Sequence, residues 1–427
     1  MTNAWKYVSI EEIAASTANA LAMGPFGSNI KSDNFVPTGV PVIRGINLSN
    51  GRFHSDGFVF ITEEKADELK SANVFPEDIV FTHRGTLGQV GIIPRDSKYP
   101  RYVISQSQMK LTCDKEKAVP LYVYYFFHSP QGQNALLSNT STTGVPAIAR
   151  PLSSLKQITI PLPSIDEQIA ISSFFGAFDD RIELNHAINN ILQKICRLIF
   201  VHWFIDFEFP DIAGKPYKSS GGKMIDSKLG KIPRGWKTGT LYDLCEITMG
   251  QSPPGDSYNK SGEGISFFQG ARDFGFRFPS RRVFCTSPKR FAKQNDVLLS
   301  VRAPIGTLNI ANEYCCIGRG LASLRLKNAE NNYLYYFLLE QQVEWEKFEA
   351  GGTVFGAITR EDINEFNIVI PPHEILKKFT EIVQPLDNMI ETNANLTIVL
   401  STIRDIHLPK IFSEKLKINY LQSKTKT

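Results

Sequence analysis

The residues that come closest to a catalytic set are Asp56, Glu63 and Lys65, whose spacing imitates the acid, acid and lysine of metal-dependent nucleases. A structural interpretation is simpler, because Thr62 could cap a short charged helix over residues 62–70. The sequence contains no Gly-rich phosphate loop ending in Gly-Lys-Ser/Thr, no G-x-G-x-x-G, no H-E-x-x-H and no Asn/Asp-Pro-Pro-aromatic tetrapeptide of amino-methylating enzymes. His83 stands beside Arg84 and is better explained as a polar contact than as a catalyst. We therefore expect no catalytic residue and no metal ligand in this chain.

A basic stretch that could bind nucleic acid lies between Gly270 and Arg302. Its charged residues are Arg272, Arg277, Arg281, Arg282, Lys289, Arg290, Lys293 and Arg302, against only Asp273 and Asp296. Interleaved phenylalanines (Phe274, Phe276, Phe278 and Phe284) could anchor the stretch to a core while its arginines reach phosphates and base edges. A run of charge is usually a solvated face, and that alternative stays open.

Polar residues able to read bases follow two of the expected strands. Arg44 and Asn47 come after residues 40–43, and Gln269 and Arg272 come after residues 266–268. Arg can pair with guanine, and Asn or Gln with adenine, through two hydrogen bonds each. The two loops differ in sequence, so we expect them to read different bases. The full set of candidate DNA-binding residues is Arg44, Asn47, Arg84, Thr86, Arg150, Gln269, Arg272, Arg277, Arg281, Arg302 and Arg360.

Several motifs occur twice in the same order, which indicates an internal repeat. Residues 78–88 correspond to 296–306, 122–126 to 333–337, 147–150 to 357–360, and 179–185 to 387–393. The last pairing continues into a matching apolar pattern, in which Ile188, Leu192, Ile195 and Leu198 fall on Leu396, Leu400, Ile403 and Ile406. Spacings of three and four mark one face of a helix, so each half should end in a helix.

Both helices follow a proline stop and should run for about 40 residues, or about 60 Å. Helices of that length with an apolar seam suggest an antiparallel coiled coil, each helix being the other's partner. The predicted seam positions are Phe178, Ile182, Asn185, Leu192 and Ile195 in the first helix, and Ile390, Asn393, Leu400 and Ile403 in the second. Buried amides at Asn185 and Asn393 would fix the register at a cost in stability, unless each faces solvent.

The expected fold class is α/β, with two similar mixed α/β domains joined by the two long helices in a pseudo-twofold repeat. Strands are predicted near residues 40–46, 78–82, 102–113, 265–269, 296–301 and 323–327, and further helices near 122–137 and 333–348. The predicted limits are a first domain over 1–162, a central long helix over 163–208, a connector over 209–231, a second domain over 232–372, a C-terminal long helix over 373–417 and a tail over 418–427.

Composition supports two ordinary globular domains. The 427 residues are 42% hydrophobic and 21% charged, with a net charge of only +4, so local rather than total charge must decide the partner. The six cysteines form no C-x-x-C pair, which argues against zinc and redox motifs and favours reduced thiols. No signal peptide and no apolar run of about 20 residues is visible. We therefore expect a cytoplasmic protein.

Taken together, the motifs resemble those of the specificity subunits of Type I restriction-modification systems. The resemblance covers nearly the whole chain. It rests on the Gly-punctuated segments 78–88 and 296–306, the closing strands 158–163 and 368–372, Glu167-Gln168 at the first helix start, and Asp179-Asp180-Arg181-Ile182. The second copy departs from the pattern, because His373-Glu374-Ile375-Leu376 replaces the Glu-Gln start. That departure puts in doubt whether the two helix starts dock partners equivalently.

The resemblance implies two target recognition domains that each read half of a split asymmetric DNA site. It also implies that the helices set the gap and dock two modification (methyltransferase) subunits, which restriction/translocase subunits then join. S-adenosylmethionine, ATP and Mg would serve adenine methylation and cleavage in the partner subunits, with no cofactor in this chain. The alternatives are a self-contained methyltransferase or nuclease with an unrecognised site, and a helical scaffold that binds only protein. If the helices set the gap, inserting about four residues after Gln193 should lengthen the frame by about 5.4 Å and the spacer by one or two bases.

Overall fold

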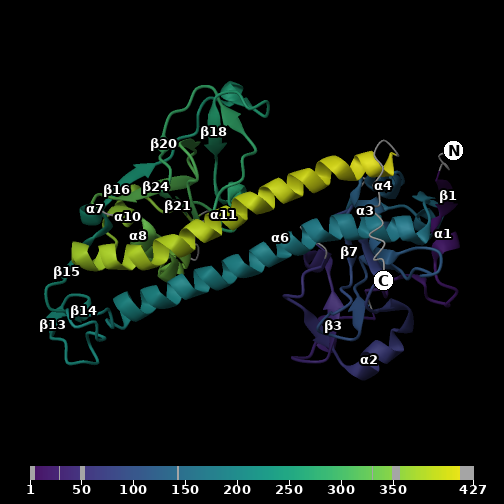
Figure 1. Ribbon diagram of the computed structural model, residues 1–427, viewed down its shortest axis with the longest axis horizontal. Coiled ribbons are helices and arrows are strands. Elements are labelled where there is room, and N and C mark those ends of the chain that lie inside the picture. The colour runs from purple at the N-terminus through teal and green to yellow at the C-terminus, as the bar shows by residue number, and fades with distance from the viewer. Residues whose placement is uncertain are drawn as a thin grey trace, which may run out of the picture. The chain divides into compact units, whose positions relative to one another are not determined.

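The computed structural model describes residues 5–27, 29–48, 53–141, 144–328, 330–348 and 356–413. Its contacts divide the chain into unit 1, Met1–Ile182 with Ile398–Thr427, and unit 2, Glu183–Thr397. Two long helices, α6 (Ile165–Phe200) and α11 (His373–Phe412), contribute segments to both units (Figure 1). The predicted tail over 418–427 lies outside the described residues, and the domain limits drawn from the sequence stay predictions.

Unit 1 contains two four-stranded sheets and two short strand pairs. The first sheet is antiparallel, in the order β2 (Leu21–Met23), β9 (Gln108–Leu111), β6 (Ile79–Thr82) and β7 (Val90–Ile92). The second has the order β4 (Val59–Ile61), β3 (Val40–Ile43), β8 (Tyr102–Ile104) and β5 (Asn73–Val74), with β3 and β8 parallel. The pairs are β1 (Lys6–Ser9) with β12 (Thr159–Leu162), and β10 (Thr140–Ser141) with β11 (Ala147–Ile148).

The short helices of unit 1 lie between these strands. They are α1 (Ile10–Ile13), η1 (Ser32–Asn34), η2 (Gly45–Leu48), α2 (Glu63–Glu68), η3 (Lys70–Ala72), α3 (Pro120–His128), α4 (Pro130–Leu137) and α5 (Pro151–Gln157). The single helix predicted over 122–137 is wrong, because Pro130 ends α3 and Ser129 caps α4 instead. The strand predicted over 102–113 is also two strands, β8 and β9, which belong to different sheets.

Unit 2 repeats this topology with one added strand. Its first sheet has the order β16 (Cys245–Met249), β24 (Leu321–Leu326), β21 (Val297–Ser300) and β22 (Leu308–Ile310). Its second has the order β17 (Tyr258–Asn259), β19 (Phe284–Cys285), β18 (Ile265–Phe268), β23 (Cys315–Ile317) and β20 (Phe291–Ala292), again with one parallel pair, β18 and β23. The strand pairs are β15 (Lys237–Thr240) with β25 (Asn367–Ile370), and β13 (Met224–Ser227) with β14 (Gly230–Pro233). The internal repeat predicted from the sequence is therefore confirmed in the strand order.

The remaining helical segments of unit 2 are η4, a π-helical turn (Val201–Ile205), α7 (Leu241–Leu244), η5 (Gly255–Ser257), η6 (Ala271–Asp273), α8 (Asn332–Glu340), α9 (Gln342–Glu346) and α10 (Arg360–Asn364). The helix predicted over 333–348 is thus divided into α8 and α9. The hairpin of β13 and β14 occupies part of the segment predicted as an exposed connector.

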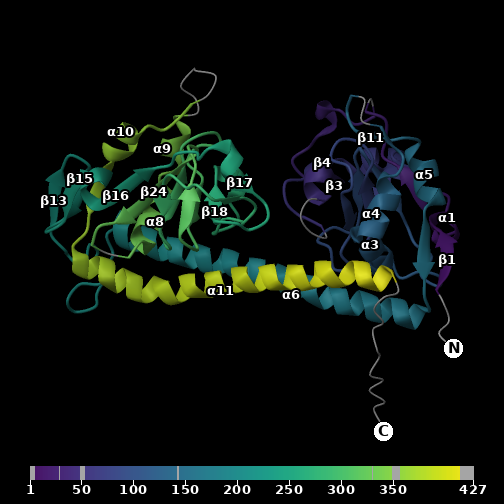
Figure 2. The same cartoon turned by 90° about the horizontal axis from the view of Figure 1, so that it is seen from above.

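Each unit builds its main core by packing one helix between a sheet and the long helices. In unit 1, the aromatic face of α3 joins Ile171 and Phe175 of α6 and Leu408 of α11. Figure 2 shows α3 beside these two long helices. In unit 2, α8 joins Phe200 and Phe379 in the same way. No helix among the described residues is long and apolar enough to cross a membrane.

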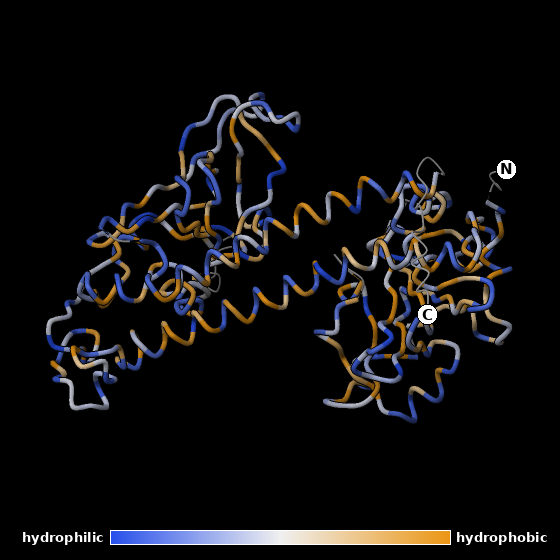
Figure 3. The backbone as a smooth tube through the Cα atoms, in the orientation of Figure 1, coloured by the Kyte–Doolittle hydropathy of each residue, from blue (hydrophilic) through white to orange (hydrophobic). Residues whose placement is uncertain are grey.

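The long helices pair along a seam with alternating spacings of three and four residues, and polar and apolar positions alternate along both (Figure 3). The buried or half-buried seam positions of α6 are Ile171, Phe175, Phe178, Ile182, Asn185, Asn189, Leu192 and Cys196. Ile195 was predicted on this seam, but its side chain is 40% exposed and Cys196 takes its place. On α11, Ile390 is buried, and Asn393, Leu400 and Ile403 are half-buried.

Amide side chains cross the seam within unit 2. Asn185 donates to the hydroxyl of Thr397 at 3.3 Å, and Asn393 donates to the amide oxygen of Asn189 at 2.9 Å. As the residue number rises along α6 it falls along α11, so the pairing is antiparallel. In unit 1, Arg404 of α11 and Asp179 of α6 form an ion pair at 2.6 Å in the same direction.

The sequence difference between the starts of the two long helices affects how each start packs into its core. Gln168 is fully buried, where it accepts from the Val119 amide and donates to the carbonyl of Pro163. Leu376, at the matching position of α11, is buried in the unit 2 core. Because both side chains are interior, this difference does not bear on an exposed docking surface.

Candidate nucleic-acid interface

In each unit, backbone hydrogen bonds join an arginine-bearing loop to a segment that ends in a second arginine. In unit 1, the Ile148 amide donates to the His83 carbonyl at 2.9 Å, and Arg84 forms a β-bridge with Ala147. In unit 2, the Ile358 amide donates to the Val301 carbonyl at 3.0 Å, and Arg302 bridges Ala357. The fold therefore places Arg84 near Arg150 and Arg302 near Arg360 in the same manner.

A second set of backbone bonds gathers the ends of neighbouring strands at the same edge. In unit 1, Ser105 donates to Ile43 at 3.0 Å and His83 donates to Ser107 at 2.9 Å. In unit 2, Gly318 donates to Phe268 at 2.8 Å and Val301 donates to Gly320 at 2.9 Å. We call these regions edge 1 (residues 24–27, 44–48, 83–88, 105–107 and 147–150) and edge 2 (residues 250–253, 269–273, 301–306, 318–320 and 357–360).

Two glycines make the close strand approach possible. A Cβ on Gly24 would lie 1.9 Å from the carbonyl oxygen of Ser105, and one on Gly250 would lie 2.1 Å from that of Gly318. No other residue fits either position without moving the backbone. The scaffold of the edge is therefore the same in both units, down to one steric requirement.

The exposed side chains on this common scaffold differ between the units. Edge 1 exposes Arg84, Thr86, Gln106 and Arg150, whereas edge 2 exposes Gln269, Arg272, Arg302, Arg319 and Arg360. Both sets combine arginines, which can hold phosphates or pair with guanine, with polar side chains that can pair with bases. One scaffold with two different polar faces can read two different sequences.

Two other candidate arginines already have partners. Arg44 is half-buried, and its guanidinium donates to the Gly57 carbonyl at 2.7 Å. Arg281 is exposed, but its Nε donates to Glu313 at 2.6 Å. Both would have to share or exchange these contacts in order to bind DNA.

Asn47 is not available to read a base in this conformation, contrary to our expectation. Its side chain is fully buried, donates to the carbonyls of His54 and Asp56, and accepts from the Arg44 amide at 2.9 Å. Short-range capping of this kind is a common role for Asn in turns. In edge 2, Asp273 does the same for the Gln269 amide at 2.7 Å.

This shared capping shows which residues of the two loops correspond. The structural counterpart of Asn47 is Asp273, so Arg272 corresponds to Ile46, whose side chain is 55% exposed. Arg277 is the second correction, because only 1% of its side chain is exposed and it lies against the long helices. Neither Asn47 nor Arg277 belongs to the surface of its edge.

His83 makes the polar contact expected of it. Its Nε2 lies 3.0 Å from the Gln106 carbonyl, and burial lowers the pKa of the imidazole below its usual range. The predicted capped helix is also confirmed, since Thr62 accepts from the Lys65 amide at 3.2 Å at the start of α2. Glu63 forms an ion pair with Arg101.

Sequence reasoning missed three exposed residues at the edges, Gln106, Arg319 and Phe26. Gln106 and Arg319 occupy matching loops before β9 and β24, each flanked by small residues in Ser105-Gln106-Ser107 and Gly318-Arg319-Gly320. Predicting one continuous strand over 102–113 concealed the first of these loops. A long polar side chain between two small residues is the signal that could have revealed both.

Known proteins that resemble this chain belong to one family. A sequence model of the family described as Type I restriction modification DNA specificity domain matches residues 3–194 and 233–402. The chain is 28% identical over 401 residues to the type I restriction enzyme MjaIX specificity subunit of Methanocaldococcus jannaschii, which covers 90% of this chain and 88% of that protein. It is 20% identical over 395 residues to the HindI specificity subunit of Haemophilus influenzae, with coverages of 74% and 82%.

A solved structure has the same fold. It is described as the Type-I restriction-modification system S subunit from M. genitalium, and it is 18% identical to this chain with a TM-score of 0.58. The match covers 96% of this chain and 97% of that one.

Proposed function

Because the chain belongs to the family of Type I restriction modification DNA specificity domains, we propose that its two units each read one half of a split, asymmetric DNA site. The chain is a DNA-recognition subunit of a Type I restriction-modification system and is not itself the catalyst. The observation that carries the proposal is the duplicated edge, in which one backbone scaffold presents two different sets of exposed polar side chains.

The direct DNA contacts we propose are the exposed residues of the two edges. In unit 1 they are Arg84, Thr86, Gln106 and Arg150, and in unit 2 they are Gln269, Arg272, Arg302, Arg319 and Arg360. Arg44 and Arg281 remain proposed contacts that must first exchange a protein partner. Since the two sets differ, the two half-sites should not be palindromic.

We propose that the paired long helices set the gap between the half-sites. Two similar readers on one frame should meet the same face of DNA about one turn apart, or about 34 to 36 Å between half-site centres. After the bases covered by each unit are subtracted, a spacer of roughly half a turn to one turn remains. The bases in this spacer should be unread.

The partners we propose are two modification subunits, which restriction/translocase subunits then join. S-adenosylmethionine would serve the modification subunits, and ATP with Mg the restriction subunits. We propose that the complex is cytoplasmic, because it acts on DNA.

A docking surface for the modification subunits is suggested by a second apolar stripe on each long helix, away from the seam. On α6 it consists of Leu184, Ile191, Ile195 and Leu198, of which Leu198 is 67% exposed. On α11 the matching repeat positions include Val399 and Ile406, both about half exposed. Exposed apolar stripes of this kind mark contact sites for other proteins. Since the stripe occurs once in each repeat, two copies of one partner fit better than two different partners.

Reconstitution tests the function directly. The purified chain alone should neither methylate nor cleave DNA, and adding its modification subunit with S-adenosylmethionine should give methylation at specific sites. Methyl transfer by the chain alone, after contaminating partner is excluded, would refute the assignment.

Charge placed in the stripes tests the docking surface. Leu198→Asp and Ile406→Asp should each remove one modification subunit from the complex, because a carboxylate buried at an interface without a partner is costly. Native mass spectrometry would count the bound copies, with Asn190→Ala, an exposed polar position of α6 away from the stripe, as the control. Two bound copies in both Asp variants would refute this surface.

A further inference from the structure

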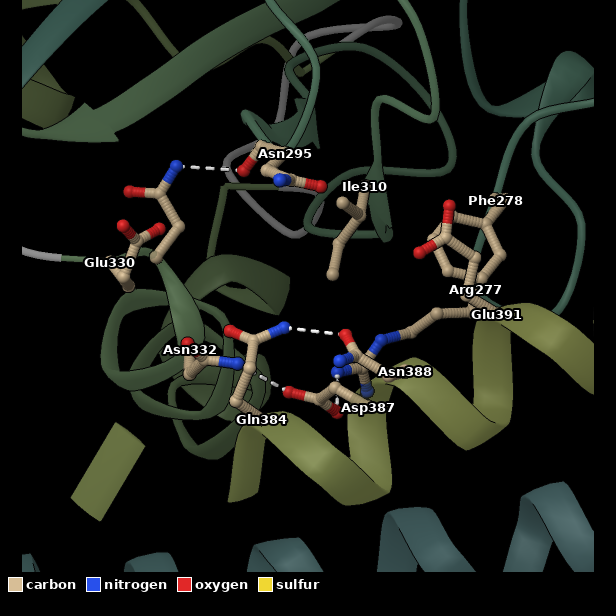
Figure 4. Close-up of a pocket in the computed structure, with 11 residues that line it drawn as sticks. Arg277, Phe278, Asn295, Ile310, Glu330, Asn332, Gln384, Asp387, Asn388 and Glu391 are labelled. Atoms are coloured by element: carbon tan, nitrogen blue, oxygen red, sulfur yellow. Dashed lines mark hydrogen bonds and ion pairs between the residues drawn. The ribbon is translucent and has the colours of Figure 1, made fainter. Parts of the chain in front are cut away.

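Arg277 is the one arginine of the basic stretch 270–302 that the structure buries. Its guanidinium donates to Asp387 of α11 at 2.6 Å and to Gln193 of α6 at 3.3 Å. It also donates to the Tyr336 hydroxyl at 3.1 Å and lies 3.7 Å from the centre of the Tyr335 ring. Figure 4 shows the side chain reaching Asp387, which is held from the other side by Asn332 at 2.6 Å.

The loop that carries Arg277 begins at edge 2. Backbone contacts close it as a narrow hairpin, with Ser280 donating to Asp273 at 2.8 Å, Phe274 bridging Pro279 and Gly275 donating to Phe278 at 3.1 Å. Arg277 lies at the tip of this hairpin, and the exposed Arg272 and Arg282 lie at its base. Arg282 reinforces the base by donating to the Arg272 carbonyl at 2.7 Å.

In unit 1, the aspartate that corresponds to Asp387 is neutralised without any residue from a loop. The repeat matches Asp387 with Asp179 and Tyr336 with Tyr125, and Tyr125 donates to Asp179 at 2.6 Å just as Tyr336 donates to Asp387 at 2.7 Å. In unit 1 the guanidinium comes from Arg404, on a long helix.

The position in α6 that matches Arg404 is Cys196. Its thiol is buried beside the Tyr336 hydroxyl and close to Arg277 and Asp387. Unit 2 therefore places a small neutral side chain on the helix and takes its cation from the hairpin.

We propose that Arg277 is a positioning residue that fixes the base-reading loop of unit 2, residues 269–282, to the paired long helices and so determines recognition of the second half-site without touching DNA. The inference rests on the proposed function, since it assumes that edge 2 reads DNA. A buried ion pair adds little stability over a neutral pair of similar shape, but it can fix one arrangement of the groups it joins. Here it joins the hairpin tip to both helices.

A neutral double variant separates positioning from stability. R277M alone should lower Tm by roughly 6–20 °C, because it leaves the largely buried Asp387 without a cation. R277M/D387N should recover most of that loss, since an amide can still accept from Tyr336 and Asn332 can flip its own amide, whose oxygen has no partner among the described residues. C196R/R277A supplies the cation from the helix, as unit 1 does, and is a second variant without the tether. D179N/R404M is the matched control in unit 1.

Two measurements on the full chain then test the proposal. In both tether-free double variants, trypsin should cleave after Arg272, Arg281 and Arg282 at least about tenfold faster than in the wild type, because loss of the tether lowers the local opening energy. With the modification subunit added, methylated sites should keep the first half and the spacer but lose sequence preference in the second half. The half-site changed by Arg302→Ala identifies the second half. The D179N/R404M control should change neither half.

The proposal would be overturned if a double variant with the wild-type Tm were cleaved by trypsin at the wild-type rate and kept the wild-type sequence preference in the second half-site. If neither double variant regained stability and both halves were lost together, Arg277 would be a structural residue only, which also contradicts it. Failure of the proposed function looks different, because the wild-type complex itself would then show no split site while the trypsin result still reported on the tether.

Discussion

Exposed arginines at edge 2 and in the hairpin that begins there differ in whether a carboxylate already neutralises them. Arg281 pairs with Glu313 and Arg282 with Asp273, whereas Arg272 and Arg302 form no ion pair with another described residue. An arginine without a carboxylate partner can offer its full charge to a phosphate, or two N–H groups to a guanine. Arg319 and Arg360 also form no ion pair with another described residue, so Arg272 and Arg302 are two of the four arginines from which the strongest DNA contacts of this edge should come.

Alanine at these two positions should weaken DNA binding without changing the fold. A base-reading arginine contributes about 1 to 3 kcal/mol, and loss of a phosphate contact should reduce the salt dependence by about one unit of slope. Affinity for cognate DNA over a range of salt concentrations measures both. Arg281→Ala, which removes an already paired charge, should have the smaller effect. If Arg272→Ala and Arg302→Ala both matched the wild type, the basic stretch would be only a solvated face.

His83 makes unit 1 sensitive to acid. Its pKa is lowered by burial, so below the ordinary value of about 6.5 the unfolded chain takes up a proton that the folded chain resists. Stability from this residue is therefore complete above about pH 6.5 and falls as the pH drops, by up to about 1.4 kcal/mol per pH unit. Denaturant unfolding of His83→Gln should show a smaller loss between pH 7.5 and 5.5 than the wild type. The exposed His373→Gln should behave like the wild type, and an equal loss in the His83 variant would contradict this explanation.

Residue-level prediction succeeded for side chains whose partners are close in sequence and failed for distant partners. Thr62 was correctly predicted as a cap because its acceptor role depends on Lys65, three residues away. Arg277 could not be distinguished from its exposed neighbours, since its partner Asp387 is more than a hundred residues further along the chain. The role of Asn47 was mispredicted although its partner is close in sequence. Its capping of the Arg44 amide is local and could have been inferred from the turn.

At the scale of elements, the repeat located both long helices, but periodicity could not say which apolar stripe faces the other helix. Leu192 belongs to the seam, whereas Ile191, Ile195 and Leu198 form an exposed stripe of the same spacing. Both stripes are apolar, so a hydrophobic pattern alone cannot rank them. The polar residues decide the register, because Asn185 and Asn189 find amide or hydroxyl partners on α11.

The antiparallel seam refines the insertion that tests whether the helices set the gap. Four residues added to α6 alone would break the Asn189–Asn393 pairing, so the insertion must be matched, after Ala187 in α6 and after Asn395 in α11. A coiled coil can absorb four residues as a local unwinding. The added turn of about 5.4 Å should lengthen the spacer by one or two bases while both half-sites keep their sequences.

The sites methylated by the matched variant, with the same modification subunit, show whether the spacer changed. Insertion into α6 alone is the control and should reduce specific methylation. A matched variant that methylates the original spacing would show that the helices do not set the gap.

At the scale of the whole molecule, the chain contains nearly the same sequence of elements twice, and the long helix of one repeat pairs with the long helix of the other. Asn185 matches Asn393 in the repeat, and Asn189 matches Thr397, so the two seam contacts exchange with each other. Interfaces between identical subunits have this self-complementary character. On the proposed function, the different exposed side chains of the two edges make the two half-sequences unlike.

The most direct test of this account is to determine every base that the wild-type chain and its modification subunit methylate in genomic DNA. Two different readers on one chain predict one target with two unlike half-sites, a fixed spacer of unread bases of roughly half a turn to one turn, and one methylated base in each half. A continuous palindromic target, or a spacer that varies from site to site, would contradict it.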